Sequence, residues 1–328
     1  MDATERDLFA DAVRRATDAH VDDARALDGA LEELGWHDAL AADPRLAVPV
    51  LFESLGASNA TSSALDAALR AGLGLADERG VVAVLPPLGG AAAPGTVTDT
   101  ESVGGDTVSV RGIATRSPED DTAALVVAAT TDGNVAATVE ANRLSFRRVE
   151  GMDPRLGLAT VAGTLPASLP RAALAPGAWA SAVDLVRLAL GHELVGAAGA
   201  MLELARDHAL ERVQFDRPIG AFQAVRHRLA DTLVAVEGAR ALLDAAWEDG
   251  SSATIAMAKA TAARAARVSA RHCQQVLAGM GFTTEHRLHR YVRRVLVLDE
   301  LFGSARALTR GLGDDLLAGG PLPAPIPL

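Results

Sequence analysis

The segment ERVQFDRPIGAFQAVRHRLAD, residues 211–231, carries the most information in this 328-residue chain. The chain has only seven Phe, three Trp and one Tyr, yet Phe215 and Phe222 both stand here, on either side of a Pro-Ile-Gly corner. Arg212 and Gln214 lie beside them, so the segment combines flat stacking faces with forked hydrogen-bond donors. Such a mixture suits a flat ligand that carries phosphate, because guanidinium groups bind phosphate oxygens in a bidentate way. The alternative is a helix-to-helix turn with an ordinary apolar contact.

Composition limits the classes of protein to which the chain can belong. Its formal net charge of −11 argues against a nucleic-acid partner, because binding to phosphate backbones needs a basic face. A single cysteine, Cys273, precludes an intrachain disulfide and suits a reducing cytoplasm. The segment MDATERDLFADAV is too charged for a signal peptide, and no uncharged apolar run approaches the roughly 20 residues of a membrane helix. We therefore expect a cytoplasmic protein without a membrane partner.

Three zones differ in their apolar pattern, and we expect three domains. Residues 1–78 have helical periodicity, which includes one predicted helix over about 48–73, and the polar residues near its middle mark either a break or a cap. Residues 79–170 contain short β-branched runs separated by Gly, Asp and Asn turns, a pattern typical of a small antiparallel sandwich or barrel. Residues 171–328 contain long amphipathic segments with short connections, which predict an antiparallel four-helix bundle. The predicted fold class is α+β.

The histidines do not have the spacing of a metal site. His286 and His289 are one helical turn apart, but the other histidines are scattered and Cys273 has no CxxC partner. Four arginines, at 287, 290, 293 and 294, share this segment with the two histidines. We expect a solvated basic helix face here and no bound metal.

Two motifs of the predicted bundle resemble those of the acyl-CoA dehydrogenase family. RVQFDRPIGAFQ, residues 212–223, is similar to the family's R-x-Q-F-G-x-P-I/L-x-x-F-Q, and QVLAGMGFTTE, residues 275–285, is similar to Q-x-x-G-G-x-G-F/Y-T-x-E. Each has one glycine replaced, by Asp216 and by Ala278. The resemblance is strongest from about residue 188 to residue 303. It implies an acyl-CoA dehydrogenase-like fold with an N-terminal helical domain, a shortened β domain and a C-terminal four-helix bundle.

In that family FAD lies between two protomers, so the resemblance implies that this chain contacts FAD. Arg212 matches a position that meets the pyrophosphate of the neighbouring protomer's FAD. Phe215 and Phe222 match positions that pack against the adenosine half and the edge of the flavin. Glycine at 279 allows a backbone to approach a ligand where a side chain would clash. The implied FAD-binding residues are Arg212, Gln214, Phe215, Ile219, Phe222, Gln275 and Gly279.

The residues that the family uses for proton abstraction have no match here. Alignment on the R-D-A-K and Y-E-G-T motifs places Phe302 on the usual glutamate, and a phenyl ring cannot abstract a proton. Other members carry the base on the first bundle helix, where this chain has Val186. No Trp occurs between Trp36 and Trp179, although the family's β domain contributes one beside the flavin. Of the remaining carboxylates, Glu193 is the best placed, ahead of the others at 203, 299 and 300.

This combination resembles the non-catalytic subunit of actinobacterial α2β2 acyl-CoA dehydrogenases that act on CoA thioesters of steroid side chains. It implies a second acyl-CoA dehydrogenase-like subunit, an acyl-CoA substrate, and electron transfer to an electron-transfer flavoprotein. Two alternatives remain open. One is a homomeric enzyme with its own FAD and a relocated base, such as Glu193 or Glu300. The other is a scaffold without flavin on a degenerate dehydrogenase fold.

Overall fold

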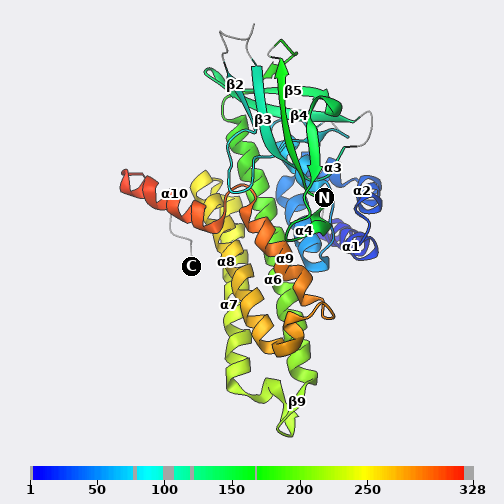
Figure 1. Cartoon of the computed structure of the whole chain (residues 1–328). Coiled ribbons are helices and arrows are strands. Elements are labelled where there is room, and N and C mark those ends of the chain that lie inside the picture. Colours follow the sequence, from blue (N-terminus) through cyan, green and yellow to red (C-terminus); the bar gives the residue numbers. More distant parts are fainter. Residues whose placement is uncertain (1–2, 77–79, 99–106, 119–121, 167, 321–328) are drawn as a thin grey trace.

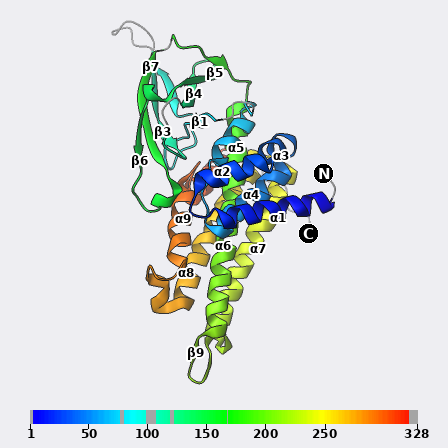
Figure 2. The same cartoon turned by 90° about the vertical axis from the view of Figure 1, so that its right-hand side faces the viewer.

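The structure is a computed structural model that describes every residue except 1–2, 77–79, 99–106, 119–121, 167 and 321–328. A sheet lies at one end of a long helical bundle, and the N-terminal helices pack beside the upper half of that bundle (Figures 1 and 2). The N-terminal helices are α1 (Ala3–Ala19), α2 (Ala24–Glu33), α3 (Trp36–Ala42), α4 (Pro44–Ser58) and α5 (Ala64–Gly72).

The helix predicted over residues 48–73 is two helices. Asn59 ends α4 in the left-handed region, at φ +61°, where asparagine is better tolerated than most residues. The next helix begins at Ala64 after a polar linker. The polar residues near the middle of the predicted helix therefore mark a break, and periodicity continued through it because both helices bury one face.

The sheet has eight strands in the order β6-β7-β3-β2-β4-β5-β8, with β1 paired to β4. The predicted antiparallel pairing holds for most neighbouring strands, but it was wrong for β1 and β2, which both run parallel to β4. Alternation of side chains has the same period in both strand directions, so it could not distinguish them. The strands are β1 (Val82–Ala83), β2 (Gly95–Thr98), β3 (Thr107–Ala114), β4 (Ala123–Thr130), β5 (Gly133–Glu140), β6 (Ser145–Arg148), β7 (Ala159–Pro166) and β8 (Ala172–Ala173).

The two faces of β4 belong to different cores. Leu125 and Val127 join the large apolar core that continues through the N-terminal helices and the bundle. Val126 and Ala128 join a smaller core enclosed by the sheet itself. Period-2 alternation thus gives the sheet its own interior and also attaches it to the helices.

The C-terminal helices are α6 (Ala178–Glu211), α7 (Gln223–Asp249), α8 (Ser252–Leu277), α9 (Leu288–Glu300) and α10 (Ala305–Leu317). Helices α6 to α9 form the predicted four-helix bundle, and α10 leaves it sideways (Figure 1). Helix α6 is long and apolar enough to cross a membrane, but 72% of its apolar window is buried by its neighbours. It is the central core helix of this fold.

Helices α4 and α6 approach each other at glycines. A Cβ atom on Gly196 would lie 2.2 Å from the carbonyl oxygen of Glu53, and one on Gly56 would lie 2.0 Å from that of Glu193. Both positions therefore require glycine for the observed packing. This contact fixes the N-terminal helices against the bundle.

Candidate cofactor and partner site

A short hairpin links α6 to α7 and forms the free tip of the bundle (Figures 1 and 2). Strands β9 (Val213–Gln214) and β10 (Arg217–Pro218) pair antiparallel, and the 3-10 helix η3 (Ile219–Ala221) leads into α7. The backbone nitrogen of Ile219 donates to the carbonyl of Arg212 at 2.8 Å, which closes the base of the hairpin. The tip is therefore an ordered structure attached to the end of α6.

The two residues at the turn have backbone conformations that usually require glycine. Phe215 and Asp216 lie at φ +54° and φ +62°. Side chains in the left-handed region are strained unless their surroundings hold them there. The effect of this turn is to point Phe215 outward, where its side chain is 86% exposed.

The aromatic residues of the first motif do come together. The rings of Phe215 and Phe222 meet edge to face with centroids 6.1 Å apart. The guanidinium carbon of Arg217 lies 4.3 Å from the centroid of the Phe222 ring, within the range of a cation–π contact. Arg217 is one of the forked donors of this segment, although the family resemblance did not place it among the implied FAD-binding residues. Its position two residues after Phe215 in a tight hairpin was the available signal.

The remaining residues of the first motif surround this aromatic stack. Arg212 follows the last turn of α6, is exposed, and has no ion pair among the described residues. Burial and the neighbouring Arg212 lower the pKa of His208, so this imidazole is largely neutral at pH 7. Gln214 donates to the carbonyl of Val213 at 2.8 Å. The hairpin thus presents two guanidinium groups and an exposed phenyl ring to solvent.

The second motif lies at the junction of α8 and α9, toward the same end of the bundle (Figure 1). Gln275 and Gly279 are exposed, and a Cβ atom on Gly279 would meet no atom within 4 Å. Ala278, which replaces a family glycine, has φ +50° and ψ −130°. Burial, and after it the charge of His208, lower the pKa of His286. This loop therefore lies near the end of α6, where His208 stands. In the described part of the chain, no hydrogen bond or ring contact joins Gln275 or Gly279 to the hairpin.

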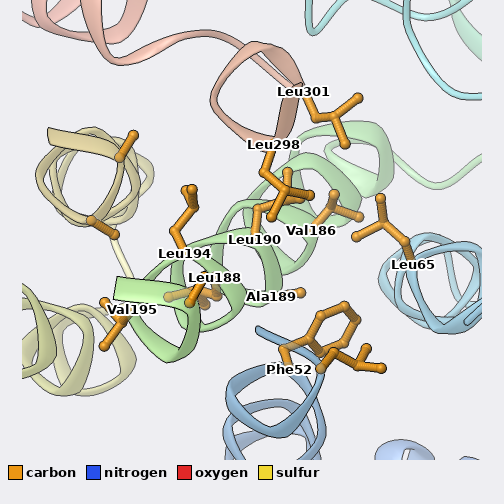
Figure 3. Packing of buried hydrophobic residues seen from close by; sticks show 14 of the residues in the cluster. Phe52, Leu65, Val186, Leu188, Ala189, Leu190, Leu194, Val195, Leu298 and Leu301 are labelled. Carbon is orange, nitrogen blue, oxygen red and sulfur yellow. The ribbon is translucent and has the colours of Figure 1, made fainter. Parts of the chain in front are cut away.

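The positions expected to carry a catalytic base lie in a closed core. Val186 is fully buried, and Phe302 is 2% exposed. Figure 3 shows Val186 surrounded by apolar side chains that include Leu65, Leu298 and Leu301. A cavity of only about 30 Å³ lies beside Leu65, Leu298 and Leu301, and neither Val186 nor Phe302 lines it.

Glu193, the alternative base, is also buried and is paired. Its carboxylate lies 3.3 Å from Nη1 of Arg294, and burial raises the pKa of Glu193. Arg294 has no exposed side-chain surface, so the prediction that it belongs to a solvated basic face was wrong. The carboxylate of Asp299 is tied to Arg267 at 2.6 Å. Both carboxylates have roles in packing.

The three tryptophans, Trp36, Trp179 and Trp247, all belong to helices and not to the sheet. Trp36 is buried in the N-terminal helices, where it donates to the carbonyl of Ala47. Trp179 donates to the carbonyl of Ala91 at 3.0 Å. Among the residues that the structure describes, no three or more His, Cys, Asp or Glu side chains are grouped so that they could hold a metal ion.

Comparison with known proteins gives the same outline. Residues 178–316 match the family Acyl-CoA dehydrogenase, C-terminal domain. The chain is 34% identical over 197 residues to the acyl-CoA dehydrogenase IpdE2 of Mycobacterium tuberculosis, a match that covers 60% of this chain and 58% of that one. It is 41% identical over 135 residues to FadE34 of the same organism, covering 39% of this chain and 19% of that one. The matched region is thus less than two thirds of the length of either relative.

Two solved structures cover almost the whole chain. The Tcur3481–Tcur3483 steroid ACAD superposes with a TM-score of 0.78 at 25% identity, over 96% of this chain and 98% of that one. The ChsE4-ChsE5 complex from Mycobacterium tuberculosis superposes with a TM-score of 0.78 at 24% identity, over 99% of each chain. The expected fold, with two helical regions around a small sheet, is confirmed by these similarities.

Proposed function

Because residues 178–316 match the acyl-CoA dehydrogenase C-terminal domain and members of this family bind FAD, we propose that the chain is the non-catalytic subunit of a heteromeric FAD-dependent acyl-CoA dehydrogenase. In this proposal the chain completes the FAD site of a second acyl-CoA dehydrogenase-like subunit in an α2β2 assembly. The complex desaturates an acyl-CoA thioester between its α and β carbons. Electrons then pass to an electron-transfer flavoprotein.

One contrast carries the proposal. The hairpin that would hold a neighbour's FAD is intact and faces outward, with Phe215 86% exposed. The position of the usual base is occupied by Phe302 inside the core. A chain with this pair of features can serve a partner's cofactor but has no free carboxylate at the family's catalytic positions.

The chain's own residues fit an FAD molecule at the tip of the bundle. Arg212 supplies a permanent, unpaired positive charge for a pyrophosphate. Phe215 and Ile219 offer apolar surface to the adenosine half, and Phe222 holds Phe215 and Arg217 in place from below. The open space over Gly279 allows the backbone there to approach the ligand. The proposed FAD-contacting residues are therefore Arg212, Gln214, Phe215, Ile219, Phe222, Gln275 and Gly279.

FAD supplies the acceptor for the hydride that leaves the β-carbon of the substrate. The proton from the α-carbon must go to a carboxylate, and in this proposal the partner provides it. The contribution of this chain is to hold the cofactor's phosphates and adenosine, which orients the cofactor and excludes water from it. Removing that contribution should weaken cofactor binding before it alters the chemistry.

The substrate class and the location follow from the relatives. One solved relative is a steroid ACAD, so we propose a CoA thioester of a steroid side chain as the substrate and a role in lipid β-oxidation. We also propose that the complex acts in the cytoplasm. The single buried cysteine, Cys273, agrees with a reducing compartment.

A paired purification tests the function. The chain is purified alone, and also after co-expression with the acyl-CoA dehydrogenase-like gene nearest to its own. Both products are sized by light scattering, and bound flavin is counted per chain from its visible absorbance. One FAD per pair of unlike chains, and none in the lone chain, supports the proposal.

Other outcomes point to the two alternatives. One FAD per chain in the lone protein favours a homomeric enzyme, and Glu193→Gln and Glu300→Gln then test for a relocated base. A colourless protein with every partner favours a scaffold. In the complex, Arg212→Ala should release FAD, whereas Arg226→Ala, which removes an exposed arginine from the surface of α7, should not.

A further inference from the structure

A second basic surface lies away from the hairpin, where α10 crosses α8. Helix α10 leaves the bundle sideways (Figure 1). Residues from the middle of α8, the end of α9 and the first turns of α10 line an open groove. The groove has a volume of about 720 Å³. We call it the α8–α10 groove, and its charged lining residues are Arg264, Arg267, Asp299, Glu300, Arg306 and Arg310.

The charges in the groove do not cancel. Asp299 is 2% exposed and is neutralised by Arg267, with its other oxygen accepting from the backbone nitrogen of Ala305 at 2.8 Å. Arg264, Arg306 and Arg310 are exposed, and none has an ion pair among the described residues. Only Glu300 opposes these three. The groove is therefore positive in a chain whose net charge is −11.

The corner that positions α10 is rigidly held. Lys259 is fully buried and donates to the carbonyl oxygens of Asp299 and Gly303. Arg187 donates to the carbonyl of Phe302 at 3.2 Å. Three unpaired arginines are therefore kept on one concave surface, although like charges repel. A surface of this kind gains free energy when an acidic group covers it.

We propose that the α8–α10 groove docks an acidic segment of the partner subunit. The inference rests on the proposed function, since it assumes a heteromeric complex. A protein segment fits better than a small anion because the groove is open and its three unpaired arginines are spread over two helices, α8 and α10. At the far end of α10, Leu317 is 89% exposed, and a small anion in the groove would leave it uncovered.

Charge reversal in the complex tests the proposal. The double variant Arg306→Glu/Arg310→Glu inverts one wall of the groove without touching the buried corner. Its matched control is Arg147→Glu/Arg148→Glu on β6, which makes the same charge change at two exposed arginines of the sheet. We expect the groove variant to raise the dissociation constant of the complex at least about tenfold at low salt, and the control to change it less than about twofold. The neutral variant Arg306→Gln/Arg310→Gln should fall between them.

Affinity is measured by sedimentation at several salt concentrations, and circular dichroism checks that each variant is folded. A folded groove variant that binds the partner like the wild type overturns the proposal while a flavin-containing complex still supports the proposed function. Absence of any complex with the wild-type chain overturns both.

Calorimetry of the lone chain with inorganic pyrophosphate tests whether the groove binds a small anion instead. Stoichiometric micromolar binding that disappears in Arg306→Glu/Arg310→Glu would assign the groove to a small anion and overturn the docking of a protein segment.

Discussion

Nε of Arg294 lies 2.8 Å from Oδ2 of Asp153 in the interior of the protein, where neither side chain is more than 4% exposed. Asp153 belongs to the connection between β6 and β7, and Arg294 belongs to α9 of the bundle. The same guanidinium group donates to the carbonyl of Ala60 at 2.7 Å and to the hydroxyl of Thr61 at 2.9 Å, both in the linker between α4 and α5. One side chain thus joins the sheet, the N-terminal helices and the bundle.

Replacing Arg294 should therefore lower the free energy of unfolding of the whole chain. Arg294→Met leaves Asp153 and Glu193 buried without their cation, a loss that typically costs about 3–5 kcal/mol. Urea unfolding followed by circular dichroism measures the change in the free energy of unfolding. The control Arg293→Met removes an exposed arginine and should change it by no more than about 0.5 kcal/mol. Equal effects of the two variants would mean that the interior network contributes nothing specific.

A second buried carboxylate should make stability depend on pH. Asp66 is 1% exposed and accepts from the hydroxyl of Thr115 at 2.9 Å, and burial raises its pKa to about 6. The ordinary pKa in the unfolded chain is 3.8. Between these values the folded state binds a proton that the unfolded state does not, so the free energy of unfolding should fall as pH rises from about 4 to about 6.

Comparison with Asp66→Asn isolates this contribution. The shift corresponds to a fall of up to about 3 kcal/mol across that range, which the neutral amide should lack. Urea midpoints of both proteins, measured at half-unit steps of pH, give the difference directly. A difference between the two that stays constant with pH would contradict the raised pKa.

The sequence predicted the bundle well because its helices are long and their ends are chemically marked. Helix α7 ends at Asp249, just before a glycine, and α8 ends at Leu277, two residues before Gly279. Arg294 was misassigned because it stands in a run of arginines. Its spacing from Tyr291, Val295 and Leu298, all buried, was the signal that places it inward. Its carboxylate partners are 141 and 101 residues away in sequence, a separation that local patterns do not encode.

The candidate site was predictable in part because its aromatic residues are close together in sequence. Phe215, Arg217 and Phe222 lie within eight residues of one another, so a tight turn brings them together whatever the rest of the fold does. The closed core around Val186 and Phe302 was not predictable in this way. It depends on leucines from several helices, among them Leu65 and Leu298, whose meeting is set by tertiary packing.

The glycines of α6 should differ sharply in their tolerance of a methyl group. Gly196→Ala places a Cβ 2.2 Å from a backbone oxygen of α4, and overpacking of this kind costs about 1–3 kcal/mol or more. Gly199, one turn later, faces only the end of the Arg240 side chain at 3.5 Å, so Gly199→Ala should be neutral or stabilise by up to about 1 kcal/mol through helix propensity. Thermal unfolding of the two variants tests this. A loss of stability in Gly196→Ala alone shows that the close contact between α4 and α6 is the cause, whereas an equal loss in Gly199→Ala contradicts it.

Ala278 should be a site at which glycine stabilises the protein. Its backbone at φ +50° and ψ −130° is one that residues with a Cβ rarely adopt, and such strain costs about 1–3 kcal/mol. Glycine relieves the strain but loses more conformational entropy on folding, so Ala278→Gly should raise the free energy of unfolding by about 1 kcal/mol. The control Ala241→Gly, at an exposed position in the interior of α7, should lower it by about 1 kcal/mol. Opposite signs from the same substitution would show that the loop between α8 and α9 is held in a strained conformation, and a loss of stability at both positions would show that it is not.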